Sequence, residues 1–255
     1  MATGTAAVEP TVHRLPVDRM RRASRTAGAL YLLTFISIPT VVLYERVRET
    51  GYITGPGPDT AAFMGGILEL IMGLACIGTA VALYPVVKRQ SEAVAMGFVG
   101  TRVLEAATIF IGVASLWTIV AIRRNGAGAE DLMVGDMLAA LYDRVFFVGQ
   151  SLVPAVNALL LGTLMYRSRL VPRGLPLLGF LGAVTLVTFN FATLFGWSGD
   201  SVDLLALVAV LPIATWEFGL GLYLVMKGFR PEAVAALDTE PAFPGTPWAG
   251  QFAAR

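Results

Sequence analysis

The sequence predicts an all-α integral membrane protein, a bundle of six transmembrane helices with both termini in the cytoplasm. Three observations lead to this prediction: the composition, the spacing of the apolar runs and the alternation of basic loops. Hydrophobic residue types make up 56% of the 255 residues and charged types only 15%, and the mean hydropathy is +0.69. Because an average soluble domain carries about 25% charged residues, the composition is typical of a membrane protein.

Six apolar runs are each long enough to cross a bilayer, whose hydrocarbon core of ~30 Å needs about 20 helical residues. We expect residues 26–230 to form the transmembrane domain, 1–25 a basic cytoplasmic tail, and 231–255 a disordered cytoplasmic tail rich in Pro, Gly and Ala. No small-residue cleavage site follows the first run, which therefore predicts a retained helix rather than a signal peptide. The runs lie at 27–44, 61–86, 95–121, 145–166, 174–197 and 204–226.

The connections between the runs are short and contain turn-forming residues. Residues 51–58 (GYITGPGP) link the first two runs, Asn125-Gly126 follows the third, and residues 197–200 join the last two. The segment 131–144 carries several charges, so we expect it to lie along the outer membrane surface before the fourth span begins.

Basic residues gather in alternate connections, and this pattern predicts the orientation. The positive-inside rule places these loops and both termini in the cytoplasm. Tyrosines suited to the headgroup level precede the bases at the ends of the second, fourth and sixth runs, and Trp117 and Trp197 lie near the opposite ends of the third and fifth. The basic set is Arg14, Arg19, Arg21, Arg22, Arg25, Lys88, Arg89, Arg167, Arg169, Arg173, Lys227 and Arg230.

Polar side chains inside the predicted spans are the candidate functional residues. A charged side chain at mid-bilayer costs roughly 2.5–3.5 kcal/mol on insertion scales, so such residues are expected to face the bundle interior. Small residues at helical spacing flank each carboxyl, as they do at helix contacts. We therefore predict one intramembrane polar cluster, formed by Glu69, Arg102, Glu105, Glu217, Gln150 and Asn157.

Charge balance gives the sharpest expectation about this cluster. Three carboxyls share one arginine, Arg102, which is one helical turn from Glu105. At least one carboxyl is therefore expected to be protonated near neutral pH, and Glu217 is the best candidate because the nearest base in its own helix, Lys227, is ~15 Å away. Two interpretations stay open: a proton or cation pathway, and a structural knot of polar groups that holds the helices together.

Several function classes have no support in the sequence. A net charge of +1 argues against a nucleic-acid partner. The single histidine, His13, precedes the first run and the single cysteine is Cys76, so no metal site or cofactor is expected. No catalytic motif is recognisable. An enzyme is therefore not favoured, and an intramembrane enzyme acting on lipid is a third alternative.

Four segments resemble a known family: RTAGALYLL (25–33), GFVGTRVLEA (97–106), LLLGTLMYRS (159–168) and WEFGLGLY (216–223). With Pro172, they are similar to the bacterial integral-membrane family catalogued as domain of unknown function 4386, over about residues 20–230. The resemblance implies a multi-helix bacterial membrane protein and carries over no catalytic residue.

From these observations we expect a multi-pass protein of the bacterial inner membrane, in contact with the lipid bilayer. The first interpretation is the transport or permeation class, with a small solute or a proton as the substrate. The alternative is a non-catalytic scaffold, sensor or partner protein in which the polar cluster is structural. The sequence leaves open the substrate, the oligomeric state and the physiological role.

Overall fold

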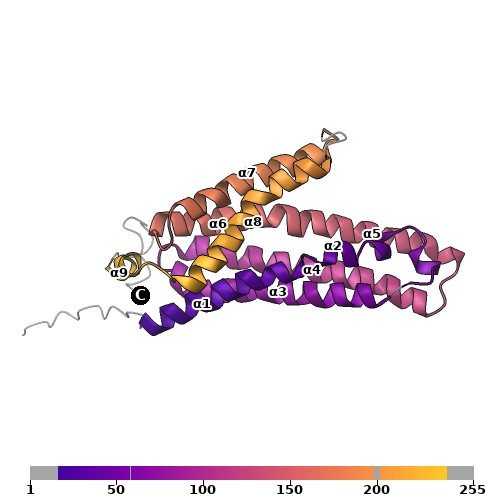
Figure 1. Cartoon of the computed structure of the whole chain (residues 1–255), viewed down its shortest axis with the longest axis horizontal. Helices are drawn as coiled ribbons and strands as arrows, with labels where there is room; N and C mark the ends of the chain where they lie inside the picture. The colour runs from indigo at the N-terminus through magenta and orange to yellow at the C-terminus, as the bar shows by residue number, and fades with distance from the viewer. Residues whose placement is uncertain (1–16, 58, 198–201, 240–255) are drawn as a thin grey trace, which may run out of the picture.

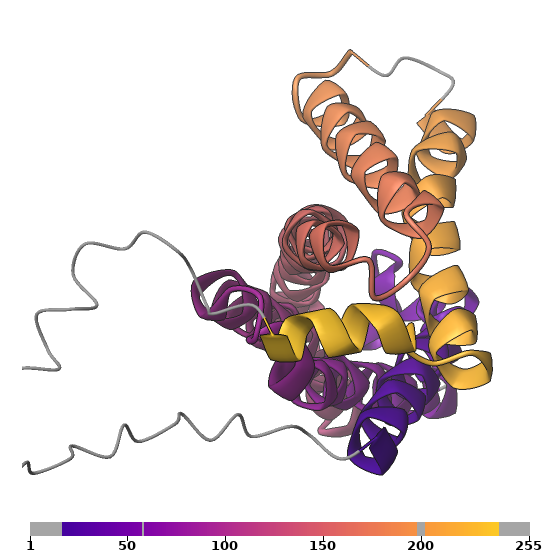
Figure 2. The ribbon, with the colours of Figure 1, turned by 90° about the vertical axis from the view of Figure 1, so that its left-hand side faces the viewer.

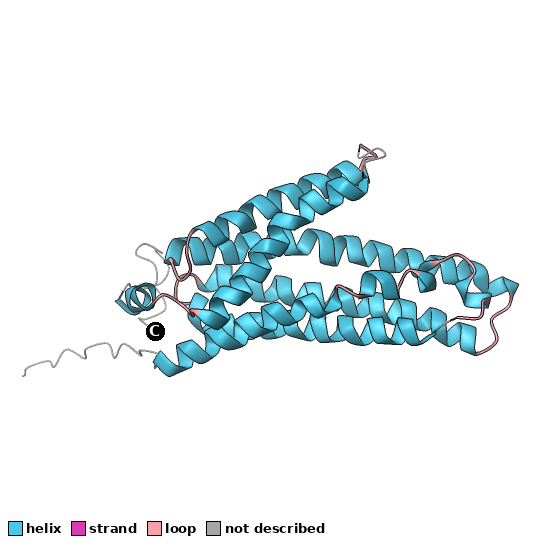
Figure 3. Ribbon diagram, viewed as in Figure 1, coloured by secondary structure: helices cyan, strands magenta, loops and turns pink. Residues whose placement is uncertain are grey.

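The computed structural model describes residues 17–57, 59–197 and 202–239, and over these residues the chain forms helices and no strand (Figure 3). The α-helices are α1 (Val17–Thr34), α2 (Thr40–Leu43), α3 (Asp59–Val87), α4 (Glu92–Arg124), α5 (Leu132–Phe146), α6 (Val153–Ser168), α7 (Gly174–Leu194), α8 (Val202–Met226) and α9 (Pro231–Thr239). The tighter or wider helical turns are η1 (Phe35–Ser37), η2 (Arg46–Arg48), η3 (Tyr52–Thr54), η4 (Ala129–Asp131) and η5 (Phe147–Leu152).

Six long helices pack in a closed ring. Going round the ring, α1 contacts α3, α3 contacts α4, α4 contacts α6, α6 contacts α7, α7 contacts α8, and α8 returns to α1. In Figure 1 α3, α4 and the α5–α6 rod run along the bundle, and the α7–α8 hairpin leans away from them. Close contact between α1 and α8 depends on glycine, since a Cβ at Gly28 would lie 2.6 Å from the carbonyl oxygen of Gly221.

Five helices are long and apolar enough to cross a membrane, which is compatible with a membrane protein. They are Asp59–Val87, Glu92–Arg124, Ala129–Ser168, Gly174–Leu194 and Leu204–Met226. All five overlap runs expected to span the membrane. The remaining run, the first (27–44), does not form a single helix of this kind.

The break in the first run comes from Pro39. A proline removes one backbone donor and its ring clashes with the preceding turn, and the chain here passes from α1 through η1 into the short α2. The hydroxyls of Thr34, Ser37 and Thr40 each donate to the carbonyl three residues back, at 2.7, 3.1 and 2.7 Å. Such bonds compete with the regular helix and favour bending.

Helix α1 also begins earlier than expected, at Val17, inside the segment 1–25 that was assigned to a tail. Met20, Ser24, Ala27 and Tyr31 recur at helical spacing and are buried, and the Ser24 hydroxyl donates to the carbonyl of Leu224 at 2.8 Å. One face of this basic segment therefore packs against α8 while its arginines stay exposed. The expected boundary at residue 25 is corrected for this reason.

The segment 131–144 does not form a separate surface element, so that expectation is wrong. Helix α5 continues through the π-helical turn η5 into α6 as one rod. The N–H of Val153 donates to the carbonyl of Val148, five residues back, just before Pro154, which has no N–H. A wide turn of this kind absorbs the proline without breaking the rod.

The C-terminal segment is helical where it is described. Residues Pro231–Thr239 form α9, which lies across one end of the bundle (Figure 2). Proline at the first helical position and Glu232 in the first turn favour this helix start. Ala233 is buried against the core. The expectation of disorder from residue 231 is therefore wrong for α9, and residues 240–255 lie outside the described residues.

The ends of the bundle have separate hydrophobic cores. We call them the α9 end, where α1 begins and α9 lies, and the α5 end, opposite it (Figure 1). The core nearer the α9 end includes Leu83, Phe98, Met165 and Trp216. The core nearer the α5 end includes Tyr44, Val47, Ile53, Leu116 and Tyr142.

Candidate functional site

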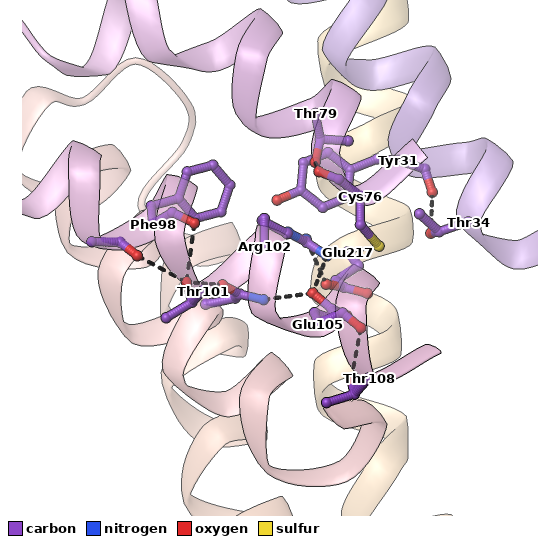
Figure 4. A network of polar contacts seen from close by, with 12 residues as sticks. Tyr31, Thr34, Cys76, Thr79, Phe98, Thr101, Arg102, Glu105, Thr108 and Glu217 are labelled. Atoms are coloured by element: carbon purple, nitrogen blue, oxygen red, sulfur yellow. Dashed lines mark hydrogen bonds and ion pairs between the residues drawn. The ribbon is translucent and has the colours of Figure 1, made fainter. Parts of the chain in front are cut away.

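Arg102 on α4 is at the middle of the first polar centre (Figure 4). Its Nη1 donates to Glu105 Oε2 at 3.0 Å and its Nη2 donates to Glu217 Oε1 at 2.9 Å. Glu105 is one turn further along the same helix, whereas Glu217 comes from α8. A single guanidinium therefore joins α4 to α8 through two carboxylates.

Further contacts bring α1, α3 and α6 to the same group. Asn157 on α6 donates from Nδ2 to Glu105 Oε2 at 2.7 Å, and its Oδ1 accepts from the Thr101 hydroxyl. Cys76 on α3 accepts from Arg102 Nη1 at 3.6 Å. The Tyr31 ring of α1 faces the guanidinium, with 4.9 Å from its centroid to Arg102 Cζ. This Arg102 centre therefore comprises Arg102, Glu105, Glu217, Asn157, Thr101, Cys76 and Tyr31.

Burial makes these interactions strong. The side chains of Arg102 and Glu105 are 2% and 3% exposed, and that of Glu217 is 20% exposed. Charges removed from water need partners, and removing one partner of a buried pair typically costs 3–5 kcal/mol. The Arg102 centre is therefore suited to holding five helices together, with Glu217 as its most accessible member.

Glu69 forms a second centre, which has a different kind of partner. It lies on α3 seven residues before Cys76, or ~10 Å nearer the α5 end. Its Oε1 accepts from the Tyr142 hydroxyl of α5 at 3.1 Å, and Tyr44 and Gln150 lie beside the same carboxyl. Glu69, Tyr44, Tyr142 and Gln150 are the Glu69 centre.

No cation compensates Glu69 within the described residues. Its side chain is buried, and neither its Oε2 nor the Tyr44 hydroxyl has a hydrogen-bond partner there. The two charged residues that line the cavity with Tyr142 pair with each other, since Arg48 Nη2 lies 2.6 Å from Asp143 Oδ1. A buried ionised carboxylate without a cation is costly, so the neutral acid suits this position better.

Local sequence explains how the two phenols reach the carboxyl. Gly65, one turn before Glu69, leaves room for the Tyr44 ring, because a side chain there would overlap it. The Tyr44 and Tyr142 rings meet edge to face, with centroids 5.4 Å apart. The π-helical turn brings Gln150 to the same region, and Gly149 beside it is in close contact with Thr108 of α4.

A cavity of about 190 Å³ adjoins the Glu69 centre. The two phenols of the centre form part of its wall, and the Arg48–Asp143 ion pair forms another part. A cavity of this size, with hydroxyl and charged groups in its wall, has room for several water molecules. The lining residues are Thr40, Tyr44, Arg48, Tyr142, Asp143 and Phe146.

A third cluster of polar side chains, centred on Asp59, lies at the α5 end. Asp59 accepts from Arg123 Nε at 3.0 Å, from Arg124 Nε at 2.6 Å and from the Tyr52 hydroxyl at 3.0 Å. Burial and this hydrogen bond to Asp59 raise the pKa of Tyr52. These contacts tie the start of α3 to the end of α4.

The structure divides the six residues expected to form one cluster. Arg102, Glu105, Glu217 and Asn157 lie together, whereas Glu69 and Gln150 lie in the second centre. Glu217 was expected to be the protonated carboxyl because its own helix holds no base nearer than Lys227, but Arg102 approaches it from α4 at 2.9 Å.

Sequence reasoning missed Tyr44 and Tyr142. Tyr142 falls in the segment assigned to the surface, three residues before the fourth run, and Tyr44 is the last residue of the first run. Their signal was a phenol at the end of an apolar run on the side opposite the basic loops.

Within the described residues, no group of three or more His, Cys, Asp or Glu side chains is placed to hold a metal ion. Comparison with curated proteins and with solved structures found no match to the chain. A family model described as a domain of unknown function (DUF4386) matches residues 26–228, from within α1 to just beyond α8. The chain therefore belongs to the DUF4386 family, as the resemblance of its sequence motifs indicated.

Proposed function

We propose that the protein crosses the bacterial inner membrane six times, with both termini in the cytoplasm, and that it belongs to the transport or permeation class with a proton as the transported or coupling ion. In this topology the five helices that are long enough to span are joined by a further crossing, the broken segment α1–η1–α2, which is the first in chain order. The segment runs alongside α3, because α1, η1 and α2 all contact that helix. A broken helix is tolerated in a membrane where hydroxyls and neighbouring helices satisfy the freed backbone groups.

The orientation follows from the charges at the two ends. Lys88, Arg167 and Lys227 lie at the α9 end and are exposed, so this end faces the cytoplasm under the positive-inside rule. Cysteines introduced at Glu49 and Glu130 should react with an impermeant reagent added outside intact cells, and cysteines at Lys88 and Arg167 should not. Native Cys76 is fully buried and should add no background. Labelling of residue 88 from outside would refute this orientation.

The observation that carries the transport proposal is the uncompensated Glu69, whose neighbours Tyr44 and Tyr142 line a cavity. A carboxyl that holds a proton and contacts phenols that border a space for water has the parts needed for reversible proton exchange. Tyr142 donates to one oxygen of Glu69 and also lines the cavity. We infer that protons reach Glu69 from the α5 end through Tyr44 and Tyr142.

A movement of the bundle is needed to pass the proton onward. Between the two centres, the Phe110 ring packs against Gly73, where a Cβ would lie 2.5 Å from Phe110 Cε1. This apolar contact separates the Glu69 centre from the Arg102 centre. On the other side of this contact lies the Arg102 centre, in which Glu217 is the partly exposed carboxyl.

Proton flux into liposomes tests the proposal. Purified protein is reconstituted with a pH-sensitive dye inside, and a potassium gradient with valinomycin supplies the driving voltage. We expect flux above that of empty liposomes for the wild type and for Glu130→Gln, which removes an exposed carboxylate. We expect Glu69→Gln to reduce the flux to the empty-liposome level. Equal flux in wild type and Glu69→Gln would remove Glu69 from the pathway.

The second candidate is a non-catalytic membrane scaffold or partner protein. The specific observation in its favour is the Arg102 centre, which is buried and paired to two carboxylates. A wild-type protein that carries no flux, while its folding depends strongly on Arg102, would favour this alternative.

A further inference from the structure

A second cavity, of about 500 Å³, lies at the α9 end of the bundle, with α9 forming one of its walls. Four arginines line it, together with Gln90 and Ser168, and the one carboxylate in its lining is Glu232. The arginines are Arg167, Arg169, Arg173 and Arg230.

The four arginines converge because two connections are held together. Arg169 ends α6 in the left-handed conformation, with φ 56° and ψ 21°, and turns the chain toward α7. The backbone N–H of Arg230, just before α9, donates to the carbonyl of Leu170 at 3.0 Å. Leu170 and Val171 are buried, so the α6–α7 connection is anchored. The site is therefore built on fixed backbone.

The arginines of this cavity differ in their partners from the arginines at the α5 end. Within the described residues, none of the four forms an ion pair, whereas at the α5 end Arg48, Arg123 and Arg124 all do. Arg173 is positioned by stacking on Tyr166, with 4.9 Å from Cζ to the ring centroid. Four guanidiniums beside one carboxylate leave a surplus of positive charge in the lining of this cavity.

We propose that this cavity binds a phosphate group, and that its source is the headgroup of an anionic phospholipid. Guanidiniums offer paired donors that match phosphate oxygens, and basic pockets at the cytoplasmic side of membrane helices suit lipid headgroups. The lipid source rests on the membrane orientation proposed above; the phosphate site itself does not.

A row of exposed apolar side chains beside the cavity favours a lipid over a soluble phosphate as the ligand. Helix α7 begins just after Arg173 and carries three apolar side chains at helical spacing from it. They are Leu177, Leu181 and Val184, which are 53%, 52% and 63% exposed. An acyl chain attached to a phosphate at Arg173 would lie along this face. A free phosphate would make no use of it.

Thermal unfolding of the purified full-length chain in a neutral detergent tests the proposal. The probes are dihexanoyl phosphatidylglycerol, dihexanoyl phosphatidylcholine and inorganic phosphate, each titrated separately. The site variant is Arg169→Gln with Arg230→Gln. The matched control is Arg21→Gln with Arg22→Gln, which removes the same charge from exposed positions on α1 outside the cavity. A third variant, Arg169→Lys with Arg230→Lys, keeps the charge.

We expect phosphatidylglycerol to raise the unfolding temperature of the wild type and of the control at lower concentration than phosphatidylcholine does. The glutamine variant should need roughly 30-fold more phosphatidylglycerol, because two guanidinium contacts are lost, and the lysine variant should fall between. If inorganic phosphate stabilises as well as phosphatidylglycerol, again through Arg169 and Arg230, the phosphate site holds and its source is soluble.

Two results would overturn the site. One is an absence of stabilisation by every probe. The other is an equal loss of response in the site variant and the α1 control, which would mean diffuse surface attraction. If the glutamine variant does not fold, the lysine variant and the single substitutions supply the same comparison.

Discussion

The two buried centres share the same helices and differ in what faces the carboxyl. Glu105 and Glu217 meet a guanidinium, whereas Glu69 meets the phenols of Tyr142 and Tyr44. Glu69 and Glu105 are buried to a similar degree. Burial therefore does not decide what a carboxyl does inside a bundle; the charge of its partner does.

This difference suits the two centres to different roles. A carboxylate paired with a guanidinium is held in one charge state and one position, which suits a joint between helices. A carboxyl that faces only neutral donors, with a cavity on the far side of those donors, changes charge without breaking an ion pair, which suits proton exchange. Substitutions in the two centres should therefore have opposite profiles of stability and flux.

The largest effect on stability should come from Arg102→Ala. It leaves Glu105 and Glu217 buried without a cation, so we expect a loss of about 3–5 kcal/mol, seen as a lower unfolding temperature or as loss of monodisperse protein. Adding Glu105→Gln should recover part of the loss. Arg124→Ala, on a side chain 56% exposed, is the control and should cost about 1 kcal/mol or less. Equal stability of Arg102→Ala and wild type would show that the pairing is not structural.

The second-largest effect on stability should come from the contact between the α5–α6 rod and α4. Gly149→Ala forces a Cβ against Thr108, which follows Glu105 on α4 by one turn. We expect a loss of about 1–3 kcal/mol in thermal unfolding, typical of overpacking. Gly97→Ala is the matched control, because its Cβ would lie an ordinary 3.6 Å from Leu160. If both substitutions cost the same, the close approach at the π-helical turn is not the reason.

Glu69→Gln should change protonation more than stability. The amide replaces a neutral acid of the same shape, so we expect a change of about 1 kcal/mol or less. Infrared difference spectra across a pH titration should show a protonated-carboxyl band at neutral pH in wild type and in Glu217→Gln. The band should be missing in Glu69→Gln. A band that disappears in Glu217→Gln instead would place the proton in the Arg102 centre.

The smallest effect should come from the ion pair beside the cavity. The side chains of Arg48 and Asp143 are each 42% exposed, so water screens their attraction, and Arg48→Gln should cost about 1 kcal/mol or less in thermal unfolding. The loss should shrink further at high salt. A cost that approaches that of Arg102→Ala would mean that this end of the bundle is as dry as the Arg102 centre.

Much of the architecture follows from local sequence. Four of the six apolar runs are helices within a few residues of the expected bounds, because length and hydropathy are local properties, whereas the run expected at 145–166 is the later part of a longer helical segment, Ala129–Ser168. The contact between Arg102 and Glu105 is also local, since residues three apart share a helix face. The break at Pro39 was visible as a proline, but its effect on the span count depended on the hydroxyl bonds around it.

By itself, the sequence determined that this protein is helical and suited to a membrane, and that charged side chains such as Glu69, Arg102 and Glu105 face its interior. Only the tertiary structure decided that Arg102 reaches Glu217, 115 positions away, and leaves Glu69 to two phenols. The physical reason is that periodicity sets which face of a helix is polar, whereas partners across the bundle depend on how helices rotate and cross. That choice is made by packing, at positions such as Gly65 and Gly28 where a missing side chain lets another element approach.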